Sequence, residues 1–447
     1  MGSAPDRRRW MVLFAGCGAL IAGCTFQYGL PYLIPGLLDD GLSLGQAGLL
    51  VSCPIAGLLL TLLAWGAAAD RWGERTVLTA GLGLGGVVLL AGVTARSTVG
   101  LAACFVLAGG ATAAVHAASG RLILGWFAAR ERGRAMAIRQ AAQPLGVSVA
   151  ALALPSLAAA GIWAALVFLA AACLVAALLV AVVVRDPDRP PVEVPVEVPT
   201  EVSPASAQPY RSPMLWRIHA TSALLVVPQF AVATFGLVYL VEERGWLAPA
   251  AGAMFAAVGV GGAAVRLAVG YWSDRAGSRL RPLRMLTVGI GAVMLALALG
   301  TLSGSGVATA VLLVAGVITV STNGLAFTAV AEHAGRPWAG RALGVQNTAQ
   351  NAVAAATPPV LAAVIAGAGY GTAFAATVVF PVLACALVPV RAERQLDTRS
   401  RVGRHADAPR PARRRKAPAP RPRPGGQRAV VGDDPRRAGR RARGDRG

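Results

Sequence analysis

The chain has one lysine, Lys416, and charged residues make up only 14% of its 447 residues. No Asp or Glu falls well inside any of its long apolar runs. A soluble protein of this length would carry about 25% charged residues. The chain also lacks a Gly-Lys-Ser/Thr motif, which forms the phosphate-binding loop of many ATP-driven proteins. Neither a soluble fold nor ATP-driven transport is therefore indicated.

The cysteines offer no metal or redox site. None of the six forms a Cys-x-x-Cys pair or lies near a histidine at metal-ligand spacing. All lie inside apolar runs, where cysteine is typically a small packing residue: Cys17, Cys24, Cys53, Cys104, Cys173 and Cys385. The sequence also contains no nucleophile–base arrangement. We therefore expect no enzyme activity, no cofactor and no bound metal.

Long apolar runs dominate what is present. Hydrophobic residues make up 55% of the chain, and the mean hydropathy is +0.58. Runs of about 20–25 residues can cross roughly 30 Å of hydrocarbon as helices. The sequence predicts twelve such spans: about 10–33, 47–68, 76–95, 98–120, 136–159, 162–184, 217–241, 248–272, 282–302, 306–330, 342–366 and 369–389. The predicted fold class is an all-α membrane protein with twelve transmembrane helices.

Arginine indicates the orientation. If the amino terminus is cytoplasmic, most arginines outside the carboxyl-terminal tail fall in cytoplasmic segments, and the outer connections carry only Arg96 and Arg244. The outer connections also carry the acidic pairs Asp39-Asp40 and Glu242-Glu243. This distribution follows the positive-inside rule. We expect a multi-pass protein of the bacterial inner (cytoplasmic) membrane, embedded in the lipid bilayer, with both termini in the cytoplasm.

A charged loop occurs twice. Gly66-Ala-Ala-Ala-Asp70-Arg71-Trp-Gly73-Glu-Arg75 joins the second and third spans. Gly270-Tyr-Trp-Ser-Asp274-Arg275-Ala-Gly277-Ser-Arg279 joins the eighth and ninth. Asp274 follows Asp70 by 204 residues, so the two loops occupy equivalent places in two sets of six spans. A repeated loop in duplicated membrane-spanning halves is typical of alternating-access transporters.

Two further landmarks support the duplication. Tyr28-Gly-Leu-Pro-Tyr32-Leu33 ends the first span, and Phe235-Gly-Leu-Val-Tyr239-Leu240 ends the seventh. Gly133-Arg134 precedes the fifth span, and Gly340-Arg341 precedes the eleventh. Six spans return the chain to the same side of the membrane, so the repeats are parallel. The sequence predicts two six-helix bundles, residues 1–184 and 217–390, with the transport site between them.

Two segments lie outside the bundles. Residues 185–216 alternate Pro with Glu and Val, which favours an extended cytoplasmic linker. Residues 391–447 contain nineteen basic and six acidic residues and few apolar ones, and they account for most of the net charge of +21. We expect a disordered, solvated cytoplasmic tail. Contact with anionic lipid is the alternative, and because no aromatic residue interleaves the arginines we expect no nucleic-acid binding.

From about Trp10 to Pro389 the chain resembles the major facilitator superfamily, on the duplicated loop motif and the twelve-span plan. The resemblance implies a secondary transporter that alternates between outward-open and inward-open states. It also implies that Asp70 meets the start of the eleventh helix, after Arg341. By symmetry, Asp274 would meet the start of the fifth, after Arg134. These contacts would close a cytoplasmic gate, with Gly66, Gly73, Gly270 and Gly277 permitting close approach. The alternative is that both loops only cap and anchor helices.

The transport site must come from polar side chains inside the spans. The candidates for substrate binding are Gln27, His116, Gln140, Gln143, Gln229, Arg266, Asn323, Asn347 and Gln350, with Arg139 and Asn351 nearby in sequence. The repeat pairs Gln140 with Asn347 and Gln143 with Gln350. Each amide could instead be an interhelical contact worth about 1–2 kcal/mol or less. His116 is the one histidine deep enough in a span to carry a coupled proton, and a packing role is the alternative.

Arg266 is the most specific of these candidates. An arginine inside the membrane is costly unless it meets water, a partner or a ligand. Arg266 precedes Gly270 by four residues, and this eighth-span pattern is similar to that of organic-anion porters, the monocarboxylate type among them. The similarity implies that Arg266 binds a carboxylate. The alternatives are that its side chain reaches toward the cytosol or pairs with Asp274.

These observations predict a secondary transporter that functions as a monomer and moves a small anionic or polar solute across the cytoplasmic membrane. The absence of an intramembrane carboxylate and the partial antiporter signature Gln140-Ala-Ala-Gln143-Pro144 disfavour export of cationic drugs. Two alternatives stay open. One is export of an uncharged drug-like compound through a mostly apolar cavity. The other is a non-transporting membrane sensor on the same scaffold.

Overall fold

The computed structural model describes residues 4–127, 129–186, 209–335, 338–390 and 393. All belong to one compact unit that clusters as residues 1–396. Residues 187–208 of the predicted linker and 394–447 of the predicted tail lie outside the described ranges. Within those ranges the regular structure is helical, and no strand occurs. This confirms the all-α fold class.

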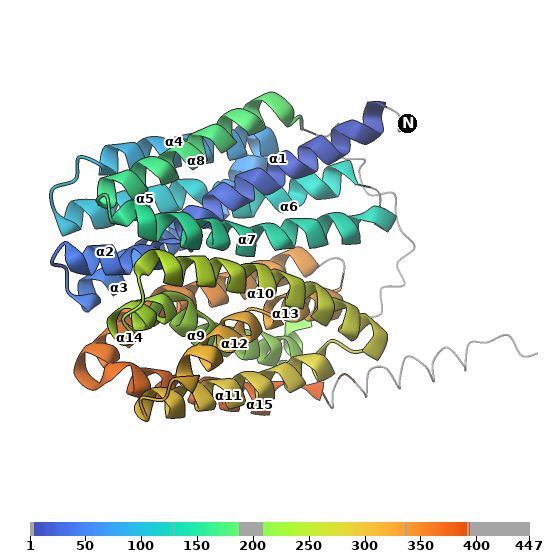
Figure 1. Ribbon diagram of the computed structural model, residues 1–447. Helices are drawn as coiled ribbons and strands as arrows, with labels where there is room; N and C mark the ends of the chain where they lie inside the picture. The colour runs from blue at the N-terminus through green and yellow to red at the C-terminus, as the bar shows by residue number, and fades with distance from the viewer. Residues whose placement is uncertain (1–3, 128, 187–208, 336–337, 391–392, 394–447) are drawn as a thin grey trace, which may run out of the picture. The chain divides into compact units, whose positions relative to one another are not determined.

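The first half contains the helices coloured blue to green in Figure 1. They are α1 (Ala4–Gln27), η1 (Leu30–Leu33), α2 (Ile34–Asp39), α3 (Leu44–Trp72), α4 (Glu74–Gly92), α5 (Thr98–Thr112), α6 (Ala114–Trp126), α7 (Ala129–Ala158) and α8 (Ile162–Val183). The fourth predicted span is thus divided, because α5 ends at Thr112 and α6 begins at Ala114.

The second half, coloured green to orange, begins after the short helix η3 (Pro209–Arg211). It comprises α9 (Pro213–Glu242), α10 (Ala248–Ala276), α11 (Leu280–Leu302), α12 (Val307–Thr319), α13 (Thr322–Ala334), α14 (Ala339–Thr377) and α15 (Val379–Leu387). The tenth predicted span is divided like the fourth. Val320 and Ser321, between α12 and α13, follow Ala113 by 207 and 208 residues, so the two breaks are equivalent in the repeat.

Eleven described helical segments are long and apolar enough to span a membrane. The last of them, Ala339–Leu387, is 49 residues long, which is about 70 Å of helix and more than twice the thickness of the hydrocarbon. Gly369 interrupts it with φ 79° and ψ 171°, a conformation that a residue with a side chain rarely adopts. This interruption separates the eleventh and twelfth predicted spans, so the twelve-span plan holds.

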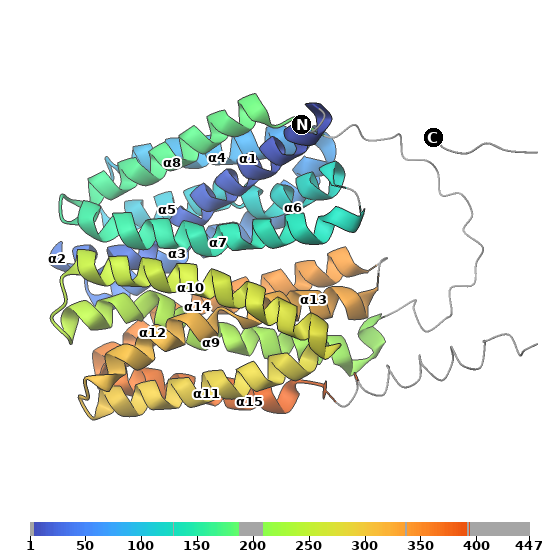
Figure 2. The ribbon, with the colours of Figure 1, turned by 45° about the vertical axis from the view of Figure 1, so that its right-hand side comes forward.

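Small residues let the helices pack closely. A side chain at Gly57 of α3 or at Gly109 of α5 would overlap the backbone of the other helix, so only glycine permits this approach. Between the halves, α7 packs against α10 and α3 packs against α14, as Figures 1 and 2 show. Large apolar side chains such as Leu60 and Leu63 are 77% and 82% exposed, which suits a lipid-facing surface.

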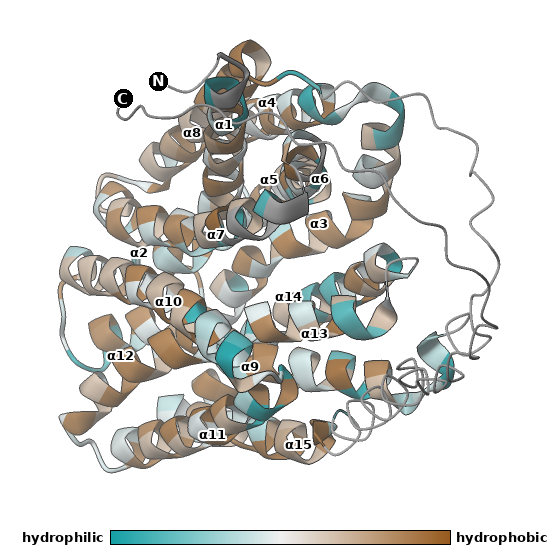
Figure 3. Cartoon of the chain, turned by 90° about the vertical axis from the view of Figure 1, so that its right-hand side faces the viewer, coloured by the Kyte–Doolittle hydropathy of each residue, from teal (hydrophilic) through white to brown (hydrophobic). Residues whose placement is uncertain are grey.

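The two sides of the helical unit are distinguished by the repeated loops. We call the side with the starts of α1 and α9 and both charged loops the motif side, at the right of Figure 1. The opposite side, with η1 and α2, is the far side. Figure 3 views the molecule from the motif side and shows mostly hydrophobic helices with hydrophilic residues gathered at helix ends.

Candidate functional site

A cavity of about 90 Å³ lies between the two halves. Its lining comes from α1, η1, α3 and α7 of the first half and from α9, α10, α12 and α14 of the second. Four of the predicted binding residues line it: Gln27, Gln143, Gln229 and Arg266. Most of the remaining lining is apolar or aromatic. The cavity therefore has a mostly apolar wall that contains a few polar groups.

Arg266 is held at the cavity by a helix break. Its Nε donates a hydrogen bond to the carbonyl oxygen of Val320 at 2.8 Å, and Val320 is the C-cap residue that directly follows α12. Carbonyls at a helix end lack intrahelical partners and accept from side chains. In the described ranges Arg266 makes no other hydrogen bond, and no carboxylate lies within 4.0 Å of it. The terminal nitrogens of its guanidinium have no described protein partner.

Gln27 is held at the equivalent break of the first half. Its Nε2 donates to the carbonyl of Gly109 at 3.3 Å and to Thr112 Oγ1 at 3.1 Å. Both partners belong to the last turn of α5. Gln27 Oε1 lies 2.6 Å from His116 Nε2, so His116 contacts a cavity-lining residue but does not itself line the cavity.

Gln229 connects the cavity to a network of amides in the second half. Asn323 Nδ2 donates to Gln229 Oε1 at 3.2 Å. Gln350 Nε2 in turn donates to Asn323 Oδ1 at 3.2 Å and to Ser222 Oγ at 2.5 Å. Of these residues only Gln229 lines the cavity. The network fixes its amide orientation because each group accepts from or donates to the next.

The remaining predicted residues lie away from the cavity lining. Gln140 Oε1 accepts a hydrogen bond from Arg139 Nη1 at 3.0 Å. Asn347 accepts from Asn351 Nδ2 through its carbonyl oxygen and its Oδ1. Asn351 Oδ1 also accepts from the Tyr28 hydroxyl at 3.1 Å, which joins α14 to the end of the first span across the two halves. Asn347 is therefore connected to the interface between the halves through Asn351.

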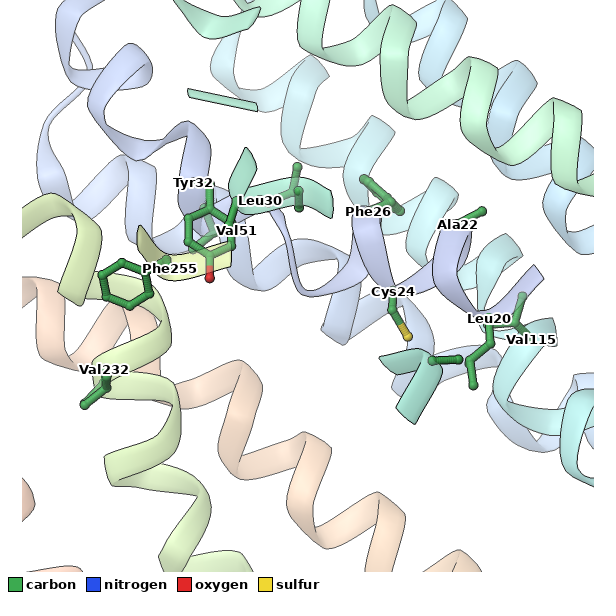
Figure 4. Packing of buried hydrophobic residues seen from close by; sticks show 14 of the residues in the cluster. Leu20, Ala22, Cys24, Phe26, Leu30, Tyr32, Val51, Val115, Val232 and Phe255 are labelled. Carbon is green, nitrogen blue, oxygen red and sulfur yellow. The ribbon is translucent and has the colours of Figure 1, made fainter. Parts of the chain in front are cut away.

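Aromatic side chains close the cavity toward the far side. The rings of Tyr32 and Phe255 lie 6.2 Å apart, and those of Tyr28 and Phe230 also lie 6.2 Å apart, each pair joining the two halves. Figure 4 shows Tyr32 and Phe255 next to each other. The analysis of polar residues alone missed this wall. Tyr28 and Tyr32, in the landmark that ends the first span, were its available signal in the sequence.

Thr234 was also missed. It lines the cavity, it is fully buried, and its hydroxyl has no hydrogen-bond partner among the residues that the structure describes. Thr234 follows Gln27 by 207 residues, so it is the repeat counterpart of that glutamine. Applying the repeat offset to Gln27 would have identified it. A buried hydroxyl without a partner costs about 1–3 kcal/mol, which marks Thr234 as a candidate for ligand contact.

The first charged loop contacts α6. Asp70 Oδ1 lies 2.5 Å from Arg121 Nη2, and Arg121 Nε lies 3.4 Å from Glu74 Oε1. Gly73, between α3 and α4, has φ 85°, which explains the glycine at this turn. Arg71 lies over the ring of Trp72 at 5.8 Å. The contact of Asp70 with the start of α14 stays a prediction.

The second loop has a denser set of ion pairs. Asp274 Oδ1 lies 2.5 Å from Arg279 Nη1, and Arg279 Nη2 lies 3.1 Å from Glu332 Oε1. Burial lowers the pKa of Arg279, but Glu332 and Asp274 outweigh it and hold the pKa above its ordinary value. Gly277 has φ 59°, and Arg275 lies over the ring of Tyr271 at 4.4 Å. Asp274 thus pairs with Arg279, and no contact with Arg266 is described.

The two arginines predicted at the helix starts are only partly described. Arg134 lies within α7, and its side chain falls outside what the structure describes. Arg341 lies in the first turn of α14, and its guanidinium is 5.0 Å from the ring centre of Trp338. The contact of Asp274 with the start of α7 therefore stays a prediction.

Each loop is also tied to an acidic residue that the sequence analysis did not single out. Asp186 Oδ1 accepts from the backbone N–H of Arg75 at 2.8 Å, in the first turn of α4. Glu393 Oε1 accepts from the backbone N–H groups of Arg279 and Leu280 at 3.0 and 3.3 Å, at the start of α11. Glu393 follows Asp186 by 207 residues, so the repeat offset was a signal for this pair. Both carboxylates stabilise a helix start.

The halves approach closely on the far side. A side chain at Gly252 of α10 would overlap the carbonyl oxygen of Ala151, and one at Gly48 of α3 would crowd the backbone of α14. At Gly66 and Gly270, on the motif side, no described atom lies within 4 Å of such a side chain. On the far side the two halves are therefore in contact through their helix backbones.

Comparisons with known proteins agree on the family. The model of the Major Facilitator Superfamily matches residues 15–358. Two relatives from strains of Mycobacterium tuberculosis, both named as uncharacterized MFS-type transporters, are 41% and 40% identical over 385 residues. The matches cover 86% of this chain and 85% of each relative.

Solved structures show the same fold. A bacterial homologue of the human lysosomal transporter Spinster, in its inward-facing unoccupied form, gives a TM-score of 0.70 at 15% identity over 87% of this chain and 97% of that one. Its inward-facing occupied form gives 0.71 at 17% identity, with coverage of 88% and 98%. The nucleoside transporter NupG gives 0.65 at 13% identity, with coverage of 84% and 98%. With the duplicated loops, the twelve spans and the cavity between the halves, the chain belongs to the major facilitator superfamily of membrane transporters.

Proposed function

We propose that this chain is a secondary transporter that carries a small organic anion by alternating access, with Arg266 as its principal ligand. The observation that carries the proposal is the guanidinium at the central cavity. Its Nε is bound to Val320 and its terminal nitrogens have no described protein partner. A cation in a largely apolar cavity is costly without a counter-charge. A carboxylate would supply that charge and could bind both terminal nitrogens.

The other polar groups of the cavity suit the rest of such a solute. Gln27, Gln143 and Gln229 each offer an amide that can donate or accept. Gln27 and Gln229 are oriented by neighbours outside the cavity, so little ordering is required when a ligand binds. Tyr28, Phe230 and the aliphatic lining suit an apolar body. A monocarboxylate with an apolar or aromatic body matches this arrangement.

We further propose that the motif side faces the cytoplasm, as the arginine distribution predicts. In this orientation the far-side contacts at Gly252 and the Tyr32–Phe255 pair close the outer path. The described state is then open toward the cytoplasm. Asp70 and Asp274 would act in the opposite state, where each would meet a helix start of the other half and close the cytoplasmic gate.

A thermal-stabilisation panel tests the substrate class. Benzoate, acetate and other carboxylates would be compared with benzamide, sugars and uncharged drugs, because a ligand that prefers the folded state raises apparent stability. We expect benzoate but not benzamide to stabilise the wild type. Arg266→Gln should weaken benzoate binding by roughly 10- to 100-fold, the loss of a charge-assisted hydrogen bond of about 1.5–3 kcal/mol.

Arg217→Gln is the matched control for this panel. The Arg217 guanidinium also donates to backbone carbonyls, those of Leu387 and Ala386, but it does not line the cavity. Its replacement should leave the benzoate response unchanged. If uncharged drugs stabilise the protein and their effect survives Arg266→Gln, the mostly apolar lining would instead support export of drug-like compounds, and the anion proposal would be wrong.

A further inference from the structure

Among the residues that the structure describes, one hydrogen bond of a cavity-lining side chain joins the two halves. The Tyr28 hydroxyl, directly after α1, donates to Asn351 Oδ1 of α14 at 3.1 Å. The side-chain hydrogen bonds of Gln27, Gln229 and Arg266 each stay within one half. Tyr28 lines the cavity and Asn351 does not. The bond therefore connects the cavity to a helix of the other half.

The backbone of α14 decides which group of this pair donates. Asn351 Nδ2 donates to the backbone carbonyl oxygen of Asn347 at 2.9 Å. A carbonyl only accepts, so the amide nitrogen must point to it and the amide oxygen must point to Tyr28. Because that oxygen also only accepts, the Tyr28 hydroxyl is the donor. A phenol has one O–H group, so the bond to Asn351 uses the only hydrogen that Tyr28 can donate.

Packing holds the Tyr28 ring between the halves. Its centre lies 6.2 Å from that of the Phe230 ring in α9. The ring also packs against a small apolar cluster to which both halves contribute: Ile55, Val226 and Ala354. In the next residue, a side chain at Gly29 would overlap the methyl group of Ala150 in α7. With the ring fixed in this way, a change of acceptor requires only rotation of the hydroxyl group.

The internal repeat does not supply a second bond of this kind. The residues 207 positions after Tyr28 and 207 positions before Asn351 are Phe235 and Pro144. Neither side chain has a polar atom, so this pair cannot form a hydrogen bond. Tyr28 also belongs to the aromatic wall that closes the cavity toward the far side. Opening of the far side would therefore separate Tyr28 from Asn351 with no equivalent bond to replace theirs.

An anion at Arg266 would compete for the Tyr28 hydrogen. Tyr28 and Arg266 line the same cavity of about 90 Å³. A hydrogen bond to a carboxylate is roughly twice as strong as one to a neutral acceptor. Because Tyr28 has one hydrogen, its bond to the anion and its bond to Asn351 exclude each other. The anion should therefore bind more tightly when the far side is open and the bond to Asn351 is already broken.

We propose that Tyr28 is an anion-binding residue whose hydroxyl exchanges Asn351 for the anion, and that this exchange favours opening of the far side. This inference rests on the proposed function. While the far side is closed and the cavity holds no anion, the hydroxyl donates to Asn351 Oδ1. When a carboxylate binds Arg266, the hydroxyl rotates and donates to the carboxylate. The halves then lose their hydrogen bond at the cavity.

A distance measurement across the far side tests the proposal. Asp40 ends α2 and Glu243 follows α9, so these two exposed residues lie on the far side, one in each half. Spin labels would be attached to Asp40→Cys and Glu243→Cys, with Cys385→Ala to remove the native cysteine that is not buried. Pulsed electron paramagnetic resonance then gives the ratio of open to closed far sides. Saturating benzoate should raise this ratio by about 2- to 10-fold, the strength of one neutral hydrogen bond.

Tyr28→Phe removes the hydroxyl and keeps the ring. Without benzoate, this variant should already show the ratio that the wild type reaches with benzoate, because the same hydrogen bond is absent in both. Benzoate should then add nothing. Tyr32→Phe is the matched control, since the Tyr32 ring also meets a ring of the other half, that of Phe255 at 6.2 Å, and no hydrogen bond of its hydroxyl is described. It should behave as the wild type.

Calorimetry of the same variants separates this inference from the proposed function. Benzoate should bind Tyr28→Phe about 2- to 10-fold more weakly than the wild type, because the bond gained with the anion is stronger than the bond lost with Asn351. An unchanged ratio in Tyr28→Phe without benzoate would overturn the inference. So would a response to benzoate that persists undiminished in Tyr28→Phe, and in either case binding that depends on Arg266 would leave the proposed function intact. Failure of every carboxylate to bind would reject the proposed function, and the inference with it.

Discussion

Backbone carbonyls orient two of the polar side chains at the cavity. Arg266 is bound to Val320 where α12 ends, and Gln27 is bound to Gly109 where α5 ends. A side chain whose rotamer is fixed before the ligand arrives loses little entropy on binding. This preorganisation leaves the terminal nitrogens of Arg266 without a described protein partner at the cavity.

Thr234 offers a test at the scale of one hydroxyl. Its Oγ1 is buried without a partner, so Thr234→Val should raise the free energy of unfolding by about 1–3 kcal/mol, because the isosteric valine removes an unsatisfied group. Thermal unfolding in detergent would measure the effect.

Thr221→Val is the matched control, because this equally buried hydroxyl donates to the carbonyl of Arg217 at 2.8 Å. It should give no gain. A loss of stability in Thr234→Val comparable to that in Thr221→Val would show that the Thr234 hydroxyl has a partner after all.

The sequence identified which spans carry polar side chains but not all of their contacts. Gln140 and Gln143 are three residues apart on α7, yet Gln143 lines the cavity and Gln140 accepts from Arg139. Helical spacing places both near one face. Which of the two glutamines faces the cavity depends on which neighbouring helix packs against each of them. The hydrophobic periodicity of one sequence does not indicate which helix that is.

At the scale of helices, hydropathy predicted the spans and missed their breaks. Pro54, Pro228 and Pro358 lie inside helices that continue through them. The fourth and tenth spans break at Ala113 and at Val320–Ser321, where no proline occurs. The local signals used to find helix ends therefore failed at the positions that hold Arg266 and Gln27.

The acidic residues at the helix starts allow a test at this scale. Asp186→Ala and Glu393→Ala each remove acceptors of backbone N–H groups at the start of α4 or α11. Each should lower the free energy of unfolding by about 0.5–2 kcal/mol, the usual cost of losing a helix cap. Thermal unfolding of the purified protein would measure it.

Asp40→Ala serves as the comparison, since Asp40 is exposed at the end of α2, where a negative charge gives no dipole stabilisation. It should be close to neutral. If Asp186→Ala and Glu393→Ala were no more destabilised than Asp40→Ala, the repeated cap would have no energetic role.

At the scale of the whole molecule, the duplication was evident in the sequence and the state was not. The matched loops around Asp70 and Asp274 predicted two equivalent halves. The residues that form the far-side contacts and those that would form the motif-side contacts are all present in the sequence. The sequence therefore does not indicate which of these two sets of contacts is formed in a given state. The backbone contact at Gly252 belongs to the far-side set, so that set is formed here.

Transport of labelled benzoate into proteoliposomes tests the central claim most directly. Vesicles containing wild type, Arg266→Gln or Arg217→Gln would be loaded with unlabelled benzoate and placed in labelled benzoate, so that exchange needs no gradient. The account predicts rapid exchange by wild type and Arg217→Gln, and at least about tenfold slower exchange by Arg266→Gln. Equal exchange by wild type and Arg266→Gln would contradict it.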